Sequence, residues 1–505
     1  MRRWWPLVTV CLGTFMLLID VTIVNVALPQ MAGDLRTSFT TLQWVVDGYA
    51  LSLGVLLLGA GALGDMAGHR RLYAGGLAVF ALSSLACGLA PDDGVLIAAR
   101  VLQGAGAAAM FTTTFALLNG AYQGRDRGVA YGVWGGVSGA AAAIGPVLGG
   151  LLTAGLSWRW IFLVNLPLSV AAIVLCRVVL RPDGARRAGR FDLAGTVTFT
   201  AAATALTLAV IRANEAGWRA PQTWGLLLVS GLALAGFVAA ERRGRHPMVD
   251  LALLRNRSFA GILIAALLVN FAAFAVITYT SIWLQSLIGL SPLAAGLTAL
   301  PTGLIALVVS AAAGARLHGR SPRAVIGGGM LLIGAGGLAG AVLVGPRSSW
   351  PALLPGFALV GLGVGLVMPA LASSGMAAVP PRRGGMAAGA LNTARQLGFA
   401  IGVAVLGTVF AGRAADRLGS AGVADPVATA HGLAAGQAGR LLAAAPEPGR
   451  PAVSAALHEA AAAGLDASFL IAAGVGLLGA VAVAVLVRPD RPAAADRRPE
   501  PVAAG

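Results

Sequence analysis

The chain has 505 residues, of which 57% are hydrophobic and only 11% are charged, whereas about 25% of residues are charged in ordinary soluble domains. Water cannot solvate so much apolar surface, so the composition excludes a soluble globular enzyme and a disordered chain, and it indicates an all-α polytopic membrane protein. Its 36 basic residues, all arginine, outnumber 20 acids. They occupy short segments between apolar runs. This placement favours loops that carry positive charge on one side of a membrane, rather than nucleic-acid binding.

Fourteen apolar runs are long enough to be transmembrane helices, because a bilayer core needs about 20 residues of helix. In chain order the runs are 7–28, 43–63, 72–90, 95–118, 129–152, 160–180, 192–211, 223–240, 259–284, 293–314, 324–345, 351–371, 386–411 and 467–487. The first run is too long for the core of a signal peptide, so we expect it to be retained as a helix.

The placement of the arginines predicts the orientation in the membrane. With a cytoplasmic N-terminus, most of the arginines outside the spans fall on the cytoplasmic side, as the positive-inside rule requires. Fourteen helices then leave both termini in the cytoplasm, and the arginine- and alanine-rich usage suggests a bacterial cytoplasmic membrane. Residues 412–465 are predicted to form a long outside loop, and residues 489–505 a disordered cytoplasmic tail.

Ionisable residues within the predicted spans are candidates for function, because a charge at the bilayer centre costs about 2.5–3.5 kcal/mol on insertion scales. Four stand out: Asp20, Asp47, Arg100 and Arg395. Residues 251–415 contain no Asp or Glu. Any carboxylate that carries a proton inside the membrane must therefore lie in the first half of the chain.

Asp20 is the strongest of these candidates, because it lies well inside the first span. A carboxylate there would bind a proton or a cation, and the alternative is a packing partner for Asn25 or Arg100. Asp47 lies near the outer end of its span and is equally well explained as a solvated acid. A buried guanidinium requires a carboxylate nearby, so we expect Arg100 to pair with Asp20 or Asp47.

Two glycine-rich segments are candidates for gating. Residues 61–71 join the second and third spans on the cytoplasmic side, and their charges indicate a latch that breaks and reforms between states. The fifth span contains a Gly-Pro-Val-Leu-Gly run, which indicates either dense packing or a hinge that seals a pathway. The candidate gating residues are Gly61, Asp65, Gly68, Arg70, Arg71, Gly145, Pro146 and Gly149.

The sequence contains no pattern for a metal, a nucleotide or a catalytic centre. Without lysine there is no Walker lysine, so the chain is not a self-contained ATP-driven pump. Its three cysteines and five histidines have no metal-ligand spacing. We therefore expect no metal, no cofactor, no nucleic-acid partner and no enzymatic activity.

Taken together, these motifs resemble the major facilitator superfamily and, within it, the fourteen-helix drug:proton antiporters of the QacA/EmrB type. The resemblance rests on residues 61–71, 100–104, the run around Pro146, 20–29, 158–167 and 392–398. It implies a six-helix bundle at 1–190, two extra linker helices at 191–250 and a second six-helix bundle at 251–488, with the long outside loop within it. It also implies alternating access around a central cavity.

The resemblance implies a monomeric, proton-driven exporter of small hydrophobic, drug-like or cationic compounds. Proton coupling would involve Asp20, Asp47 and Arg100. The implied substrate-binding residues are Asp20, Asn25, Gln103, Asn392, Arg395, Gln396, Phe271, Phe274, Tyr279 and Trp283. The four aromatic residues are candidate walls of the cavity, and their simpler explanation is lipid-facing or core packing. Two alternatives remain: an exporter of a single metabolite, such as a self-made antibiotic, siderophore or amino acid, and a non-transporting membrane receptor or scaffold.

Overall fold

The computed structural model describes residues 2–37, 39–181, 192–218, 220–244, 248, 251–316, 320–380 and 383–488. Within these ranges every regular element is helical. The predicted tail at 489–505 lies outside the described residues.

The helices fall into three successive groups along the chain. The first group comprises η1 (Arg2–Trp4), α1 (Trp5–Leu35), α2 (Phe39–Ala67), α3 (His69–Gly88), α4 (Asp93–Ala121), α5 (Gly124–Gly155), α6 (Trp160–Leu163) and α7 (Asn165–Val179). The second comprises α8 (Leu193–Ala216) and α9 (Pro221–Arg243). The third comprises α10 (Leu251–Leu254), α11 (Arg257–Asn270), η2 (Phe271–Ala275), α12 (Val276–Ser286), α13 (Pro292–Arg316), α14 (Pro322–Leu343), η3 (Trp350–Leu353), α15 (Leu354–Ala377), α16 (Gly384–Ser420), α17 (Pro426–Ala434), α18 (Ala438–Ala444), η5 (Glu447–Gly449) and α19 (Arg450–Leu486).

Thirteen helical segments in the described part of the chain are long and apolar enough to cross a membrane. They correspond to thirteen of the fourteen predicted spans. The remaining predicted span, 129–152, falls within α5, a continuous helix of 32 residues. The helix pattern is therefore compatible with fourteen crossings.

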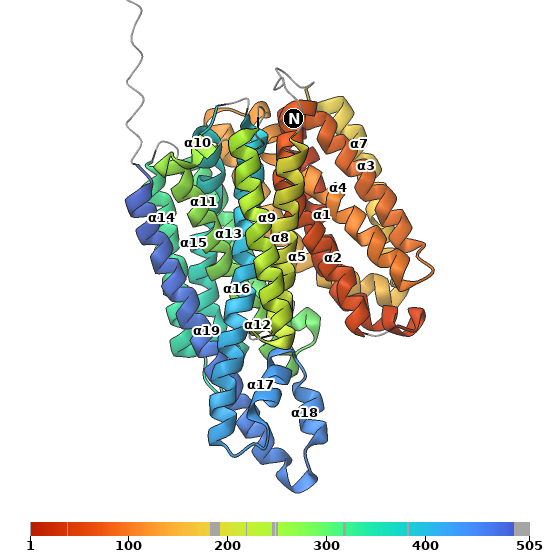
Figure 1. Cartoon of the computed structure of the whole chain (residues 1–505), viewed down its shortest axis with the longest axis vertical. Helices are drawn as coiled ribbons and strands as arrows, with labels where there is room; N and C mark the ends of the chain where they lie inside the picture. The colour runs from red at the N-terminus through yellow and green to blue at the C-terminus, as the bar shows by residue number, and fades with distance from the viewer. Residues whose placement is uncertain are drawn as a thin grey trace, which may run out of the picture.

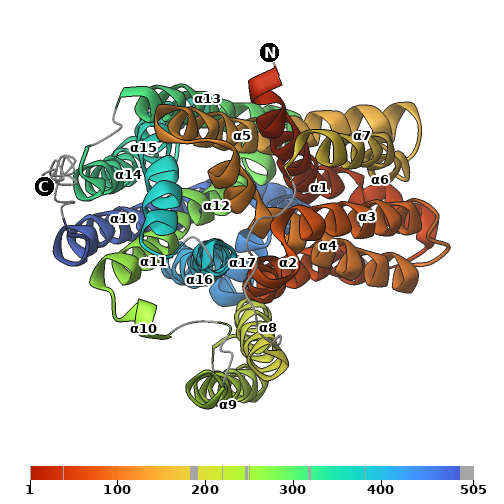
Figure 2. The same cartoon turned by 90° about the horizontal axis from the view of Figure 1, so that it is seen from above.

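The first and third groups form two bundles that lie side by side, and α8 and α9 pack as a pair at their edge (Figure 2). The bundles meet chiefly where α5 packs on α13 and where α2 packs on α16. Helix α8 contacts both α2 and α16, so it borders the junction between the bundles.

The stretch 412–465, predicted as a loop, is instead largely helical. Helices α16 and α19 each have 37 residues, or about 55 Å of helix against a hydrocarbon core of about 30 Å. They project beyond the other helices and carry α17 and α18 at their tips (Figure 1). The segment is rich in alanine, the best helix former, and Leu418, Leu433 and Leu457 are buried together at its centre.

Close approach of α1 and α5 depends on glycines of α5. A Cβ atom on Gly149 would lie 2.8 Å from the carbonyl oxygen of Ile23, and one on Gly145 would overlap the hydroxyl of Thr22. Small residues let membrane helices pack backbone to backbone in this way. The side chain of Pro146, the third predicted gating residue of α5, lies outside what the structure describes.

This packing predicts different outcomes for two neighbouring glycines. Gly149→Ala should lower the thermal unfolding midpoint in detergent, because overpacking a close contact costs about 1–3 kcal/mol. Gly150→Ala is the matched control, since a Cβ atom there would meet nothing within 4 Å and alanine favours the helix. Equal midpoints for the two variants would contradict this account of the α1–α5 contact.

Candidate functional site

A buried polar network joins four helices of the first bundle around Asp20. Arg100 Nη1 donates to one carboxylate oxygen of Asp20 in an ion pair, and both side chains are fully buried. The other oxygen accepts hydrogen bonds from Gln103 Nε2 at 3.0 Å and from Asn165 Nδ2 at 3.1 Å. Gln103 Nε2 also lies 2.8 Å from the hydroxyl of Ser84. The network therefore links α1, α3, α4 and α7.

Arg100 is held from several sides. Its Nε donates to the carbonyl oxygen of Val45 at 2.8 Å, and its Nη1 also donates to Gln103 Oε1 at 2.7 Å. The guanidinium carbon lies 4.1 Å from the centre of the Tyr49 ring, within cation–π range. Its Nη2 is buried without a hydrogen-bond partner among the described residues. The Arg100 guanidinium is thus ion-paired with Asp20 and stacked on Tyr49, but one of its nitrogen atoms lacks a hydrogen bond to a described residue.

Local sequence on α4 explains how these groups come together. Arg100 and Gln103 are three residues apart and so share one face of the helix. Gly104 follows, and a Cβ atom there would lie 2.9 Å from Cβ of Ser52 on α2. The missing side chain lets α2 approach α4, which places Tyr49 over the guanidinium.

The structure decides between the two predicted partners of Arg100 in favour of Asp20. Asp47, on α2, is instead half-buried and lines a separate cavity together with Gln396 of α16. Asn25 lies on α1, but its side chain is outside what the structure describes. Sequence reasoning missed Tyr49, Ser84 and Asn165 as members of the network. The only signal for Asn165 was a polar residue within the apolar stretch 158–167.

A second polar contact connects the two bundles at the end of α2 that carries residues 61–71. The carboxylate of Asp65 accepts hydrogen bonds from the backbone N–H groups of Gly385 at 2.7 Å and Met386 at 2.9 Å, in the first turn of α16. An acidic group there also complements the positive end of the helix dipole. Gly61 packs directly against Gly385. We call this contact between Asp65, Gly61 and the start of α16 the latch.

The arginines predicted to act in the latch have other contacts. Arg70 donates from Nη2 to the carbonyl oxygen of Arg177 at 2.8 Å, and Arg71 is exposed. Gly68 adopts a positive φ of 101°, which turns the chain from α2 into α3 and is a conformation that favours glycine. His69 Nε2 lies 3.3 Å from the Asp65 carboxylate.

At the opposite end of the first bundle, an exposed acid ties α1 to the turn that precedes α6. Trp158 Nε1 donates to Asp34 at 2.9 Å, and Arg159 Nη1 donates to the same oxygen at 2.5 Å. These hydrogen bonds, from Trp158 first and then from Arg159, hold the pKa of Asp34 below its ordinary value. This is a surface contact, separate from the buried network around Asp20.

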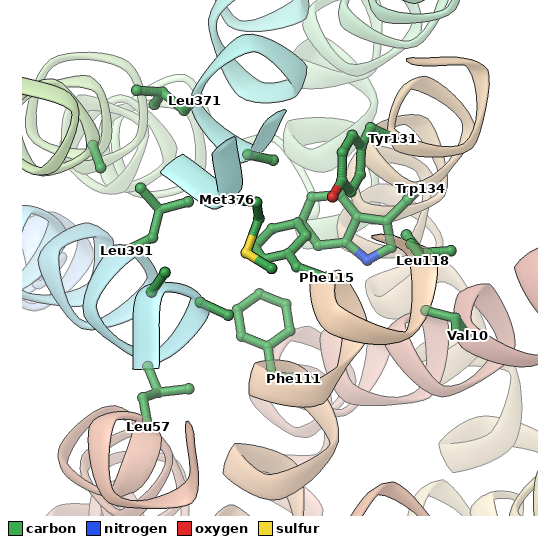
Figure 3. Close-up of a cluster of buried hydrophobic side chains, with 14 of the residues drawn as sticks. Val10, Leu57, Phe111, Phe115, Leu118, Tyr131, Trp134, Leu371, Met376 and Leu391 are labelled. Carbon is green, nitrogen blue, oxygen red and sulfur yellow. The ribbon is translucent and has the colours of Figure 1, made fainter. Parts of the chain in front are cut away.

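Between the bundles, next to the latch, apolar side chains fill the space. Phe111 and Phe115 of α4 face Met376 of α15 and Leu391 of α16 (Figure 3). The ring of Phe115 also packs edge-on against Trp134 of α5, with centroids 4.7 Å apart. In this conformation a layer of packed side chains therefore closes the interface between the two bundles next to the latch.

The remaining predicted binding residues divide into two sets. Asn392 is fully buried and accepts a hydrogen bond from Arg395 at 3.3 Å, and the guanidinium carbon of Arg395 lies 6.0 Å from the centre of the Phe111 ring. Phe271, Tyr279 and Trp283 are instead buried inside the second bundle, and Tyr279 stacks on Phe410. Phe274 is partly buried against the larger core cluster. The role of these four aromatic side chains in substrate binding therefore stays a prediction.

The chain is similar to proteins named for antibiotic resistance, export or transport. A family model of the Major Facilitator Superfamily matches residues 10–403. The puromycin resistance protein of Streptomyces alboniger is 38% identical over 86% of this chain and 87% of its own length. The tetracenomycin C resistance and export protein of Streptomyces glaucescens is 33% identical over 99% of this chain and 94% of its own length. The solved structure of the human organic anion transporter MFSD10 has a TM-score of 0.63 at 17% identity, covering 95% of this chain and 99% of that one.

Breaking the buried ion pair on one side should destabilise the fold more than removing both charges. Arg100→Leu leaves an unpaired buried carboxylate, which costs about 3–5 kcal/mol. The double variant Asp20→Asn, Arg100→Leu leaves no buried charge, so its thermal midpoint in detergent should lie between those of Arg100→Leu and the wild type. Identical midpoints for the single and double variants would contradict a charge-based role for the pair.

Loss of the latch carboxylate should expose the start of α16 to solvent exchange. In Asp65→Asn, the amides of Gly385 and Met386 lose a charged acceptor worth about 1.5–3 kcal/mol per hydrogen bond. Hydrogen–deuterium exchange of a peptide covering 384–389 should therefore quicken at least about tenfold. Asp34→Asn, which removes an acid at the other end of the bundle, is the control and should leave this peptide unchanged. Unchanged exchange in Asp65→Asn would show that the latch does not depend on the carboxylate.

Proposed function

This chain belongs to the major facilitator superfamily, and we propose that it exports a hydrophobic, drug-like or antibiotic compound across the bacterial cytoplasmic membrane in exchange for protons. Its similarity to resistance and export proteins supports the drug-like cargo. The observation that carries the coupling proposal is the fully buried Asp20–Arg100 pair, since Asp20 is an acid within a helical segment long and apolar enough to cross a membrane.

Protonation of Asp20 would change the charge balance of its network. With Asp20 ionised, the pair is neutral overall and Asp20 also accepts from Gln103 and Asn165. A proton on the carboxylate would leave the Arg100 cation without its counter-ion in a dry site, which is costly. The protonated form therefore favours a conformation in which water reaches Arg100. In this way a proton biases an equilibrium between two states.

Exchange of proton for cargo also requires that only one side of the membrane is open at a time. The latch and the neighbouring apolar layer close the interface between the bundles at the end that carries residues 61–71. Both termini and this end are assigned to the cytoplasm by the arginine distribution. The conformation is therefore one that is closed toward the cytoplasm. Reopening requires Asp65 to leave the start of α16, and rocking of the two bundles would achieve this.

The proton gradient is the proposed energy source, and no cofactor enters the scheme. One charge moving through about 100 mV supplies about 2.3 kcal/mol. A monomer contains both bundles and the proton site, so the proposed cycle requires a single chain. Asp47 remains a candidate second coupling group, because it is an acid within the second predicted span and lines the cavity between α2, α8 and α16.

The breadth of cargo separates this proposal from its main alternative. The similar proteins include two named for one antibiotic each and one multidrug resistance protein, from Mycobacterium tuberculosis. Resistance of an expressing strain to a panel of unrelated toxic compounds would indicate broad export, whereas resistance to one compound would indicate a dedicated exporter. A receptor or scaffold would confer no resistance and move no protons.

Proton coupling predicts that cargo binding releases protons from purified protein through Asp20. Adding puromycin or tetracenomycin C to weakly buffered detergent solution should acidify it for the wild type, and Asp20→Asn should abolish the signal and the efflux, because its amide holds no titratable proton. Asp34→Asn, with expression matched, should retain both. Proton-coupled efflux that persists in Asp20→Asn would refute the role of this carboxylate.

A further inference from the structure

Four exposed arginines gather at one corner of the second bundle. They are Arg255 and Arg257 at the start of α11, Arg323 in the first turn of α14 and Arg488 just after the end of α19. These helix ends lie at the end of the molecule that carries the latch (Figure 1). None of the four forms an ion pair with a described residue. We call these four residues the arginine corner.

Close packing of α11 on α19 holds two of these arginines next to each other. The backbone N–H of Arg488 donates to the hydroxyl of Ser258 at 3.1 Å, which places the end of α19 beside Arg257. One turn further along α11, a Cβ atom on Gly261 would lie 2.8 Å from Cβ of Leu486. The neighbourhood of the two arginines is therefore fixed by packing of helices.

Helix α14 adds a third arginine to the same corner. A Cβ atom on Gly327 would lie 3.8 Å from Cγ1 of Val483 on α19. Arg323 lies four residues before Gly327, and Arg488 lies five residues after Val483. Both arginines therefore lie beyond this contact, at the same end of the two helices.

The charge of the arginine corner has little compensation. Residues 251–415 contain no Asp or Glu. On α19, Asp466 lies 22 residues before Arg488, about 33 Å away along the helix. The sequence places Asp250 and Asp490 nearer, outside the described residues, and counting both still leaves an excess of positive charge. Neighbouring like charges repel, so the corner favours a negatively charged partner.

The helices that carry the corner continue as exposed apolar surface. Val481 and Val485, in the last two turns of α19, are exposed. Ile264 of α11 is also exposed and lies seven residues after Arg257, on the same face of the helix. Both helices belong to segments long and apolar enough to cross a membrane. The guanidinium groups therefore lie at one end of an apolar surface that acyl chains can cover.

We propose that the arginine corner binds the headgroup of an anionic phospholipid, whose acyl chains lie along the apolar surface of α11 and α19. Basic groups at the ends of membrane helices recognise acidic headgroups, and a guanidinium offers paired N–H donors that match phosphate oxygens. A zwitterionic headgroup would bring a second cation to a site that is already positive. The inference goes beyond the proposed export function, because no step of transport enters it.

Lipid titrations of the purified, delipidated full chain in neutral detergent test the site, with native mass spectrometry as the readout. The wild type should bind phosphatidylglycerol. The double variant Arg257→Gln, Arg488→Gln should raise its Kd about 25-fold, since each arginine near a lipid headgroup contributes a factor of about five. Its thermal midpoint without lipid should match the wild type, because both side chains are exposed.

A matched control removes the same charge elsewhere. Arg242 and Arg243 are exposed at the end of the linker helix α9, which packs chiefly on α8. The double variant Arg242→Gln, Arg243→Gln should therefore bind phosphatidylglycerol within about twofold of the wild type. An equal loss in the two double variants would mean that the lipid responds only to overall charge, and it would overturn the corner as the site. Unchanged binding in Arg257→Gln, Arg488→Gln would overturn it as well.

Comparisons on the wild type identify the class of partner without any variant. Phosphatidylcholine, which is zwitterionic, should bind at least about tenfold more weakly than phosphatidylglycerol, and equal binding would overturn an anionic partner. Glycerol 3-phosphate carries the phosphate but no acyl chains, so a millimolar excess should leave phosphatidylglycerol bound. Displacement by glycerol 3-phosphate would assign the corner to water-soluble phosphates and overturn the lipid.

Discussion

The structure of the first bundle depends on one buried ion pair, between Asp20 and Arg100. Two opposite charges in a dry interior are stable only when each compensates the other and the remaining polar atoms find partners. Here Gln103, Asn165 and Ser84 provide partners from α4, α7 and α3, while Nη2 of Arg100 has none among the described residues. The pair therefore fixes how four helices pack. It also makes their packing sensitive to the charge state of one carboxylate.

The pair is connected to the interface between the bundles through α2. Arg100 stacks on Tyr49 and donates to the carbonyl oxygen of Val45, both on α2. The same helix lines the cavity at Asp47 and ends in the latch at Asp65. A change in charge around Asp20 is thus applied to a helix that already forms two contacts with the second bundle. The proposed coupling would thus follow a continuous series of contacts, from Arg100 through α2 to the latch.

Sequence alone predicted the helical fold. A membrane requires long apolar runs and places arginines in the loops of one side, and neither feature depends on tertiary contacts. It also predicted that Arg100 needs an acid, from the cost of a buried guanidinium. It could not choose between Asp20 and Asp47, since that choice depends on how α1 and α2 rotate against α4. The helical extension at 412–465 was missed because its stability comes from the mutual burial of Leu418, Leu433 and Leu457, which a composition rich in Ala, Gly and Pro does not reveal.

Helix α16 carries the second bundle's latch contact and its polar candidate binding residues. Its first turn receives Asp65, its middle carries Asn392, Arg395 and Gln396, and its far end projects beyond the other helices. Residues 251–415 contain no acid, so α16 carries no carboxylate before Asp416 and responds to the buried ion pair through its contacts with the first bundle. The two bundles therefore have unequal roles in the proposed cycle. In that cycle the first bundle would sense the proton, and α16 would transmit the result to the latch and the cavity, since it borders both.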